Sequence, residues 1–292
     1  MRCPTLEQLP LPPPGNTGWP WTEETPQLSE RMSDGRDWPQ ICVVTPCLNQ
    51  APFIEATVRS VLLQGYPALE YVLVDGGSTD GSLDVIRRYA PHLTAWTSEA
   101  DRGQSDAINK GIRMGRGEIV AWLNSDDLYE PRALEFAAAE FADHPDLVLL
   151  YGDCLNIDPQ GQVFSVSHSR PYQRDRLIRH WPNYIPQPTA FFRRKAFEAV
   201  EGLDISLHYA MDYDLWIRLG AVGPAAFLPR ALARFRVHPA SKTGAGAVTY
   251  WPEMRRVSRR HGAELLSPML IKLLRDRFYI FRQRLKRGLG WS

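Results

Sequence analysis

The stretch that decides the fold runs from residue 41 to residue 49 and reads ICVVTPCLN. Its first four residues are apolar without interruption, which is typical of a strand buried on both faces of a parallel sheet. The segment 53–63 follows, with apolar residues every three or four positions, and this spacing predicts an amphipathic helix. A buried strand that leads through a polar turn into a helix is the first unit of an α/β fold.

The same alternation of strand and helix continues beyond this unit. Strands are predicted at 71–74, 93–97, 119–123 and 147–151, and helices at 83–89, 105–114 and 133–141. This order predicts an α/β fold with a Rossmann-like, mostly parallel central sheet and flanking helices on both faces. Because ligands bind at the carboxyl ends of the strands in such sheets, we expect a site in the loops after Val44, Val74 and Leu123.

The two ends of the chain differ from this middle part. We divide the 292 residues into a Pro-rich N-terminal arm (1–39), an α/β domain (40–245) and a C-terminal helical extension (246–292). Trp19, Trp21 and Trp38 are expected to pin the arm to the domain. In the extension, apolar residues from Leu266 to Leu285 recur at helical spacing with Lys and Arg opposite, which predicts a basic amphipathic helix. Such a helix either packs on the domain or lies on an anionic membrane surface.

Charge and composition exclude several classes of protein. Residues 251–292 carry 11 Lys and Arg against 3 Asp and Glu, whereas the first 250 residues carry a net −7, so that the total is +1. A general nucleic-acid binder is expected to be basic, and we predict no nucleic-acid partner. We expect no signal peptide, because residues 1–11 lack an apolar h-region. We also expect no membrane-spanning helix, because no apolar run approaches about 18 residues. The four cysteines lack the spacing of a zinc site and are expected to be reduced thiols.

Polar clusters follow three of the predicted strands, at 45–49, 75–80 and 124–127. The second cluster contains glycines but no G-x-G-x-x-G pattern, which disfavours a dinucleotide-binding enzyme. A carboxylate at a strand end can accept hydrogen bonds from a base or a ribose, so we assign Asp75 to a ligand. Ser78 and Asp80 are assigned to capping the next helix.

The third cluster contains two adjacent carboxylates, Asp126 and Asp127, at the end of an apolar strand. Like charges repel there unless a cation lies beside them, and oxygen ligands favour Mg²⁺ or Mn²⁺. The alternative is an N-cap for the following helix, a role that Asp127 alone would fill. The position of this pair, third in a series of strand-end clusters, favours the metal site.

In this order the three clusters resemble the inverting family 2 glycosyltransferases of the GT-A fold. Segment 43–49 resembles the family's opening strand and turn, 71–81 its nucleotide-binding loop, and 124–127 falls where the family has its D-x-D metal motif. Segment 98–111 resembles a branch associated with bacterial O-antigen and exopolysaccharide assembly. The resemblance spans about residues 41–243.

The resemblance implies an enzyme that moves a sugar from a nucleotide-diphosphate sugar, commonly a UDP-sugar, to a hydroxyl of a glycan or lipid-linked acceptor in cell-surface polysaccharide synthesis. The implied donor-binding residues are Thr45, Pro46, Asn49, Asp75, Asp101, Lys110, Asn124, Ser125, Arg236 and Lys242. Two positions depart from the family pattern, since Gly76 replaces a second aspartate and Asn124 replaces the first aspartate of D-x-D. Neither suggests a dead enzyme, because Asn can hydrogen-bond to a ribose hydroxyl and Asp126 keeps the charge that holds a metal.

On the acceptor side, segment 211–218 (MDYDLWIR) resembles the family's E-D-x-x-L-x-x-R element, whose aspartate is the catalytic base. Asp212 matches that aspartate, and an inverting transfer needs one carboxylate to take the proton of the acceptor hydroxyl. The alternative for Asp212 is a helix-start residue favoured by the dipole. Asp214 is expected to be a surface or capping charge. Gln187 and Trp216 are expected on the acceptor side.

Segment 235–243 resembles the family's R-x-H element. His238 is expected to complete the metal site or to touch the diphosphate, although a lone His is more often structural. Arg236 and Lys242 would neutralise phosphate charge in the leaving group.

A catalytically silent sugar-nucleotide-binding or scaffold protein of the same fold is the alternative function, and the presence of both Asp126 and Asp212 argues against it. A nucleotidyltransferase usually begins with a Gly-rich, basic phosphate loop, which residues 45–50 lack. We expect a cytoplasmic enzyme that lies at the inner face of the plasma membrane if its tail binds lipid.

Overall fold

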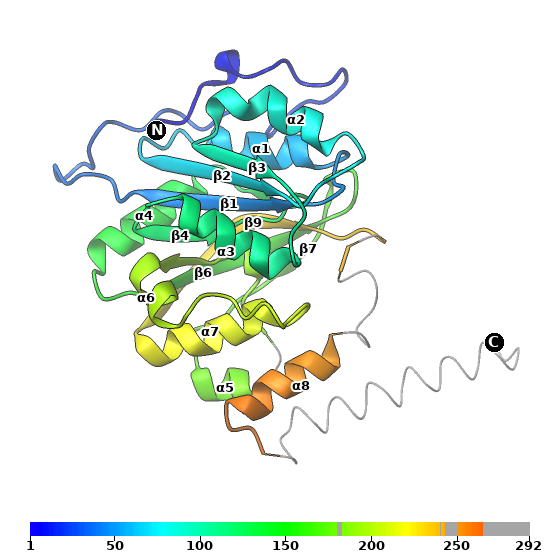
Figure 1. Cartoon of the computed structure of the whole chain (residues 1–292). Coiled ribbons are helices and arrows are strands. Elements are labelled where there is room, and N and C mark those ends of the chain that lie inside the picture. The colour runs from blue at the N-terminus through cyan, green and yellow to red at the C-terminus, as the bar shows by residue number, and fades with distance from the viewer. Residues whose placement is uncertain (180–182, 240, 243–249, 265–292) are drawn as a thin grey trace, which may run out of the picture.

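The computed structural model describes residues 1–179, 183–239, 241–242 and 250–264. In this part of the chain a curled sheet is covered by helices on both faces (Figure 1). The helices are α1 (Ile54–Leu62), α2 (Ser82–Tyr89), α3 (Gln104–Met114), α4 (Ala133–Asp143), α5 (Arg174–Arg179), α6 (Arg194–Ala199), α7 (Met211–Val222) and α8 (Trp251–Arg260). The strands are β1 (Ile41–Cys47), β2 (Leu69–Asp75), β3 (Ala95–Ser98), β4 (Ile119–Trp122), β5 (Leu128–Tyr129), β6 (Leu149–Ile157), β7 (Val163–Ser167), β8 (Phe191–Arg193) and β9 (Ala225–Arg236).

The sheet has the strand order β3-β2-β1-β4-β8-β6-β9-β5, and β7 pairs with β6. The first four strands are parallel neighbours, as the strand–helix alternation predicts. Beyond β4 the pairing is mixed, because β8, β5 and β7 are antiparallel to their partners while β6 and β9 are parallel. The predicted α/β fold is confirmed, and β5, β7, β8 and β9 are strands that the sequence pattern does not reveal.

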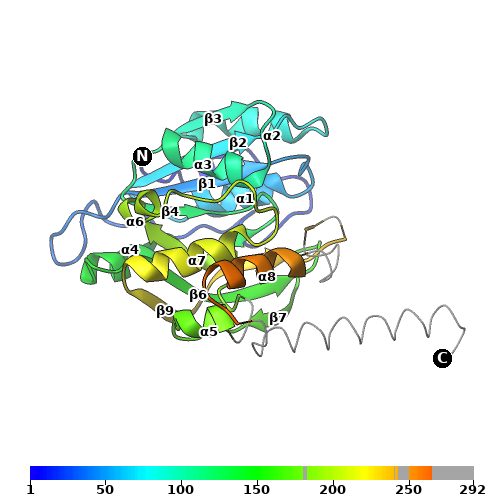
Figure 2. The same cartoon turned by 60° about the horizontal axis from the view of Figure 1, so that its bottom comes forward.

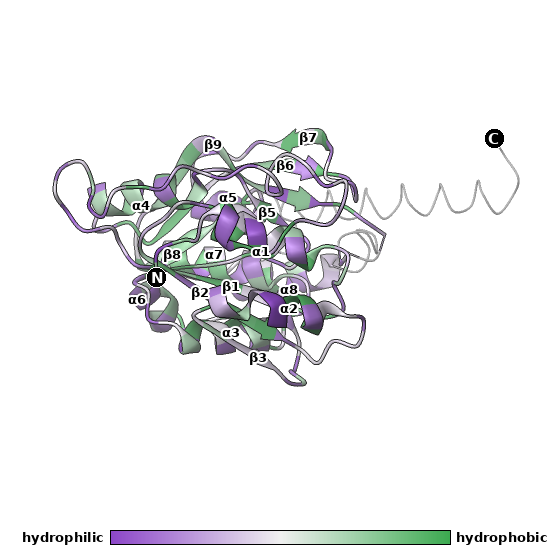
Figure 3. Cartoon of the chain, turned by 90° about the horizontal axis from the view of Figure 1, so that it is seen from above, coloured by the Kyte–Doolittle hydropathy of each residue, from purple (hydrophilic) through white to green (hydrophobic). Residues whose placement is uncertain are grey.

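The apolar run that opens β1 fills the core on both faces of the sheet, because successive side chains of a strand point in opposite directions. Ile41 and Val43 pack with α1, α2 and α4, whereas Cys42 and Val44 pack with α3 and α7. In Figure 3 the helices that flank the sheet carry both purple, hydrophilic and green, hydrophobic residues, as expected for helices with one face on the core. Helix α3 lies so close to β1 that a Cβ at Gly111 would come within 2.4 Å of a methyl group of Val44.

The N-terminal arm lies against the domain, as the three tryptophans predict (Figure 1). The indole N–H of Trp19 donates to the carbonyl oxygen of Tyr129 at 2.8 Å. Trp38 packs edge-on against Tyr66, with ring centroids 5.6 Å apart. These contacts tie the arm to the α1 and β2 side of the molecule.

Arg59 of α1 is fully buried beneath this arm. Its guanidinium donates hydrogen bonds to the carbonyl oxygens of Pro10 (2.8 Å), Pro20 (3.0 Å) and Trp21 (2.9 Å). The Trp21 ring also lies 5.6 Å from the guanidinium carbon. One buried cation therefore organises three positions of the arm.

Helix α8 lies at the start of the C-terminal extension and packs on the domain beside α5 and α7 (Figure 2). Met254 and Val257 belong to the same buried cluster as α7, and Ser258 donates to the carbonyl oxygen of Ile178 at 2.6 Å. The predicted amphipathic helix from residue 266 onward lies outside the described residues. Among the helices that are described, we find none with the length and apolar content needed to cross a bilayer.

Candidate active site

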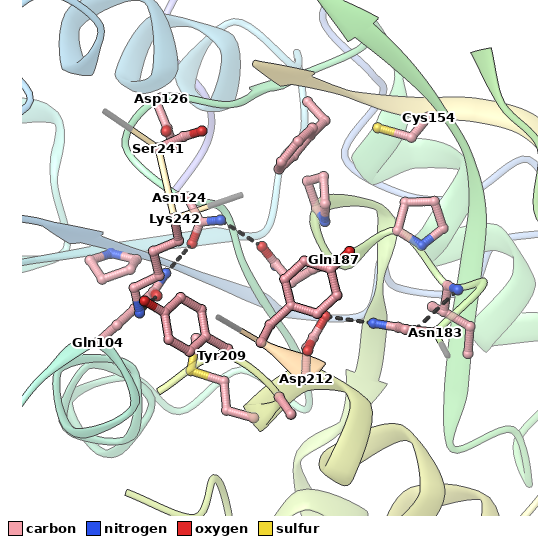
Figure 4. Close-up of a pocket in the computed structure, with 18 of the residues that line it drawn as sticks. Gln104, Asn124, Asp126, Cys154, Asn183, Gln187, Tyr209, Asp212, Ser241 and Lys242 are labelled. Atoms are coloured by element: carbon pink, nitrogen blue, oxygen red, sulfur yellow. Dashed lines mark hydrogen bonds between the residues drawn. The ribbon is translucent and has the colours of Figure 1, made fainter. Parts of the chain in front are cut away.

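A cavity of about 1290 Å³ lies at the carboxyl ends of β1 and β4, where the sheet topology predicts a site. It reaches from the strand-end loops to the start of α7. Several predicted site residues line it together, namely Pro46, Asp101, Asn124, Ser125, Asp126, Gln187, Asp212 and Lys242. Figure 4 shows the central members of this group facing one another across the cavity.

The two adjacent carboxylates after β4 have different surroundings. Asp126 lines the cavity, and its Oδ2 lies 3.0 Å from Nε2 of His238. Asp127 is fully buried and accepts hydrogen bonds from the backbone N–H of Arg236 (2.9 Å) and from Nδ2 of Asn124 (3.2 Å). Burial, together with the charge of Asp126, raises the pKa of Asp127.

Asp127 therefore fastens the end of β9 to the loop after β4, and this places His238 beside Asp126. The sequence prediction that Asp127 is a direct metal ligand is corrected, because its carboxylate is buried and bonded to the protein rather than exposed to the cavity. Arg236 supports the same junction, since its Nε donates to the carbonyl oxygen of Asp126 at 2.8 Å.

Asp126 and His238 are the residues that fit a divalent cation. Within the described part of the chain, no group of three or more His, Cys, Asp or Glu side chains surrounds one point. A carboxylate oxygen and an imidazole nitrogen suit Mn²⁺, and Mg²⁺ is usually held by only one or two carboxylates together with substrate phosphates. The pair fits the protein side of a site that a nucleoside diphosphate would complete.

Asp212 is the second residue of α7, and its carboxylate lines the cavity. Its Oδ2 accepts a hydrogen bond from Nδ2 of Asn183 at 2.7 Å, and its Oδ1 accepts one from the backbone N–H of Tyr213 at 2.7 Å. Burial raises the pKa of Asp212 to about 6, although both hydrogen bonds and the charge of Lys242 favour the ionised form. A carboxylate with this pKa is ionised at neutral pH and is suited to accepting a proton.

A chain of hydrogen bonds crosses the cavity between the Asp126 side and the Asp212 side (Figure 4). Nζ of Lys242 donates to Oε1 of Gln104 at 2.7 Å, and Nε2 of Gln104 donates to Oδ1 of Asn124 at 2.6 Å. Nδ2 of Asn124 in turn donates to Oε1 of Gln187 at 2.9 Å. Each amide in this chain is oriented by its neighbours, and the burial of Lys242 lowers the pKa of its amine.

The loops after β1 and β2 are joined to each other by hydrogen bonds. Of the donor-binding residues predicted at these two strand ends, Pro46 lines the cavity, whereas Asn49 and Asp75 bond to the loops themselves. The carboxylate of Asp75 accepts four hydrogen bonds, from the backbone N–H groups of residues 77 and 78 and the hydroxyls of residues 78 and 98, at 2.5–3.1 Å. The side chain of Asn49 accepts the backbone N–H of Thr79 at 2.8 Å. Asp80 accepts the N–H of Ser82, the first residue of α2, although Gly81 is the N-cap residue of that helix. The assignment of Ser78 to capping is wrong, because its hydroxyl donates to Asp75.

Three further predicted residues lie away from the cavity wall. Thr45 is fully buried and its hydroxyl bonds to that of Tyr71 at 3.0 Å. Lys110 pairs with Glu99 at 2.9 Å. The prediction of Trp216 on the acceptor side is wrong, because Trp216 is fully buried and stacks on Trp122 in the core.

Asp214 is also corrected, because it is not a surface charge. It is fully buried and pairs with Arg218 at 2.6 Å and with His261 at 3.1 Å. Since His261 follows α8, this carboxylate joins α7 to α8.

Sequence reasoning missed other cavity residues, all of which except Gln104 lie on segments where the sequence offers no motif. They are Gln104, Arg170, Arg176, Asn183, Tyr184, His208, Tyr209 and Trp251. Gln104 lies inside segment 98–111, so a search for side-chain amides near the polar clusters would have found it. For the others the only signal is their place in the fold.

The family model described as Glycosyl transferase family 2 matches residues 42–201 of this chain. The chain is 32% identical to a chondroitin synthase of Escherichia coli over 64% of its own length and 27% of the relative's. It is 30% identical to a PGL/p-HBAD biosynthesis glycosyltransferase of Mycobacterium tuberculosis, over 62% of this chain and 69% of that one. The chain thus spans about a quarter of the Escherichia coli relative.

Solved structures share the fold. A crystal structure of S. aureus TarS 1-349 in complex with UDP-GlcNAc covers 80% of this chain and 71% of that one, with 20% identity and a TM-score of 0.64. The mannosyltransferase PcManGT from Pyrobaculum calidifontis, in complex with GDP-Man and Mn2+, covers 71% of this chain and 59% of that one, with 25% identity and a TM-score of 0.54. The sheet and its flanking helices are therefore those of known glycosyltransferases.

Proposed function

This chain belongs to glycosyl transferase family 2, and we propose that it moves a sugar from a nucleotide-diphosphate sugar to an acceptor hydroxyl with inversion at the anomeric carbon. The observation that carries the proposal is Asp212, a carboxylate in the cavity wall with a pKa of about 6, oriented by Asn183. Inversion needs one such base and no covalent intermediate on the enzyme.

In the proposed reaction the acceptor hydroxyl donates its proton to the Asp212 carboxylate while its oxygen attacks the anomeric carbon. The bond from that carbon to the diphosphate oxygen breaks, and its electron pair leaves with the nucleoside diphosphate. Lys242 keeps a positive charge near Asp212 and holds Gln104, which orients Asn124. Asn124, Ser125, Asp101 and Pro46 are the residues we assign to the donor.

Asp126 and His238 would hold Mg²⁺ or Mn²⁺, and a bound cation would neutralise negative charge on the diphosphate. The same ion type is present in the complex of PcManGT with GDP-Man and Mn2+. We propose UDP-sugars as donors, since TarS of S. aureus forms complexes with UDP-GlcNAc and with UDP. The similarity to a chondroitin synthase supports a role in polysaccharide synthesis.

The proposal is tested by measuring release of nucleoside diphosphate from a panel of sugar nucleotides with Mn²⁺ or Mg²⁺. Asp212→Asn is expected to lower transfer by about 10²–10⁴-fold, the usual contribution of a general base, while donor affinity stays as in the wild type. Asp126→Ala is expected to weaken metal-dependent donor binding. Asp84→Asn, a change to an exposed carboxylate on α2, is the matched control and should behave as the wild type.

Two results would count against this reaction. Near-normal turnover of Asp212→Asn would remove the assignment of the base. Metal-dependent donor binding without turnover of any donor would instead support a silent sugar-nucleotide-binding protein.

We also propose that the enzyme works in the cytoplasm, with the basic residues of segment 251–292 at the inner face of the plasma membrane. The excess of Lys and Arg in residues 251–292 supports this placement. Truncation after Arg260 should then reduce binding to anionic liposomes, and a loss of thermal stability without that reduction would argue for a tail that packs on the domain.

A further inference from the structure

The cavity wall carries two arginines that the proposed reaction does not use. Arg170 follows β7 and Arg176 belongs to α5, and both line the cavity. Both are exposed, and among the described residues neither guanidinium pairs with a carboxylate. A guanidinium group can form two parallel hydrogen bonds to a carboxylate or a phosphate, so both arginines are suited to binding an anionic ligand.

Both arginines lie near one cavity residue, Tyr184. Burial raises the pKa of Tyr184, and the positive charges of Arg176 and Arg170 both act against that increase. Tyr184 lines the cavity and directly follows Asn183, which donates to the Asp212 carboxylate. The two arginines therefore line the same cavity as Tyr184, Asn183 and the Asp212 base.

The backbone beneath each arginine is held by buried groups. The hydroxyl of Tyr151 donates to the carbonyl oxygen of Arg170 at 2.7 Å. Helix α5 is held by the hydroxyl of Tyr213, which donates to the carbonyl oxygen of Leu177 at 2.6 Å. The main chain that carries each arginine is thus held in place, which lowers the entropic cost of binding a ligand.

The acidic groups nearby do not satisfy these arginines. Asp153 is occupied by the backbone N–H of Ser169 at 2.8 Å and by Nδ1 of His168 at 3.1 Å. The carboxylates that line the cavity are Asp101, Asp126 and Asp212, and we assign them to the donor, the cation and the base.

We propose that the acceptor is an anionic saccharide whose carboxylate or phosphate is bound by Arg170 and Arg176 while its hydroxyl reaches Asp212. This inference rests on the proposed glycosyl transfer and narrows its substrate class. A neutral acceptor would leave both guanidinium groups without a carboxylate partner within the part of the chain that the structure describes.

Binding of defined oligosaccharides to the whole protein without donor tests this subsite. The probes are tetragalacturonate, 6-phosphorylated maltotetraose and neutral maltotetraose. The affinity for each is measured by calorimetry at low and at high salt. The wild type should bind at least one anionic probe more tightly than the neutral one, and the pair of anionic probes separates carboxylate from phosphate. Arg170→Gln and Arg176→Gln should each weaken that binding by about tenfold, the effect of losing one charge-assisted hydrogen bond.

Arg179→Gln is the matched control, because Arg179 lies on the same helix, pairs with Glu264 and is not part of the cavity wall. It should bind all probes as the wild type does. Equal binding of neutral and anionic probes, or unchanged anion binding in both cavity variants, overturns the proposal. Nucleoside diphosphate release is measured in parallel, so that an inactive enzyme is distinguished from an active one with a neutral acceptor.

Discussion

The Asp212 carboxylate shows how single residues set the working range of the cavity. Burial raises its pKa to about 6, and the hydrogen bond from Asn183 acts in the opposite direction because it favours the ionised form. A base is active when deprotonated, so kcat/KM should fall as pH decreases through the pKa of the free enzyme, near 6.

Replacing Asn183 by Leu should therefore raise the pKa of Asp212 further. The acid limb of the kcat/KM profile is expected to move to higher pH, while the rate on the high-pH plateau changes less. A profile measured from pH 4.5 to 9 checks this shift. If the decrease of kcat/KM at acid pH is unchanged in the Leu variant, a group other than Asp212 causes it. The residual activity of Asp212→Asn should then decrease over the same pH range.

At this scale the sequence predicts which residue types meet at the strand ends but not which way each one faces. Asp126 and Asp127 are neighbours in the same cluster, yet one lines the cavity and the other is fully buried against Arg236. That difference is set by Arg236 at the end of β9, 109 residues away in the chain. A local pattern contains no information about such a partner.

At the scale of elements, α8 supports the helix that carries the base. Glu253 of α8 accepts hydrogen bonds from the backbone N–H groups of His208 (3.0 Å), Tyr209 (2.6 Å) and Ala210 (3.0 Å), immediately before α7. Burial would raise the pKa of Glu253, but these three donors hold it below its ordinary value. The charge of Glu253 thus satisfies N–H groups at the start of α7.

Glu253→Gln should lower the free energy of unfolding by about 1–3 kcal/mol at pH 7, because it removes the charge from these hydrogen bonds. Since the folded pKa is depressed, the stabilisation is fully present above the unfolded pKa of about 4.3 and is lost as pH falls through the folded value. Urea unfolding at pH 7, 5 and 3.5 should show the difference from the wild type shrinking with acidity. Glu198→Gln, at an exposed position, is the control, and a pH-independent difference would argue against a role for the charge.

Element prediction succeeds for the long buried strand β1 and fails for β9, where burial is partial, and for the two- and three-residue strands β5 and β8. Strand β1 is buried at every position and its apolar run is plain in the sequence. Strand β9 reads AAFLPRALARFR, with exposed residues and a proline among buried ones, because it lies near the sheet's far edge. The strand is stabilised by its pairing with β6, and its own residue pattern does not indicate a strand.

At the scale of the whole molecule, the N-terminal arm and helix α8 pack on opposite sides of the sheet. The arm covers α1, whereas α8 packs with α5 and α7, and it is α8 that contributes Trp251 and Met254 to the cavity (Figures 1 and 2). Within the described residues, none before Pro46 lines the cavity. The arm is therefore expected to serve stability and the extension to serve the site.

Arg59→Met tests that division. Methionine fills a volume similar to that of arginine but carries no charge and no N–H group. The change therefore leaves the carbonyl oxygens of Pro10, Pro20 and Trp21 without the hydrogen bonds that the buried Arg59 guanidinium donates. We expect the free energy of unfolding to fall by about 3 kcal/mol or more, since each unsatisfied buried acceptor costs about 1–3 kcal/mol. Donor affinity, measured well below the unfolding transition, should remain that of the wild type. Arg87→Met, on the exposed face of α2, should alter neither quantity. Loss of donor affinity in a variant that unfolds like the wild type would show instead that the arm acts on the cavity through α1.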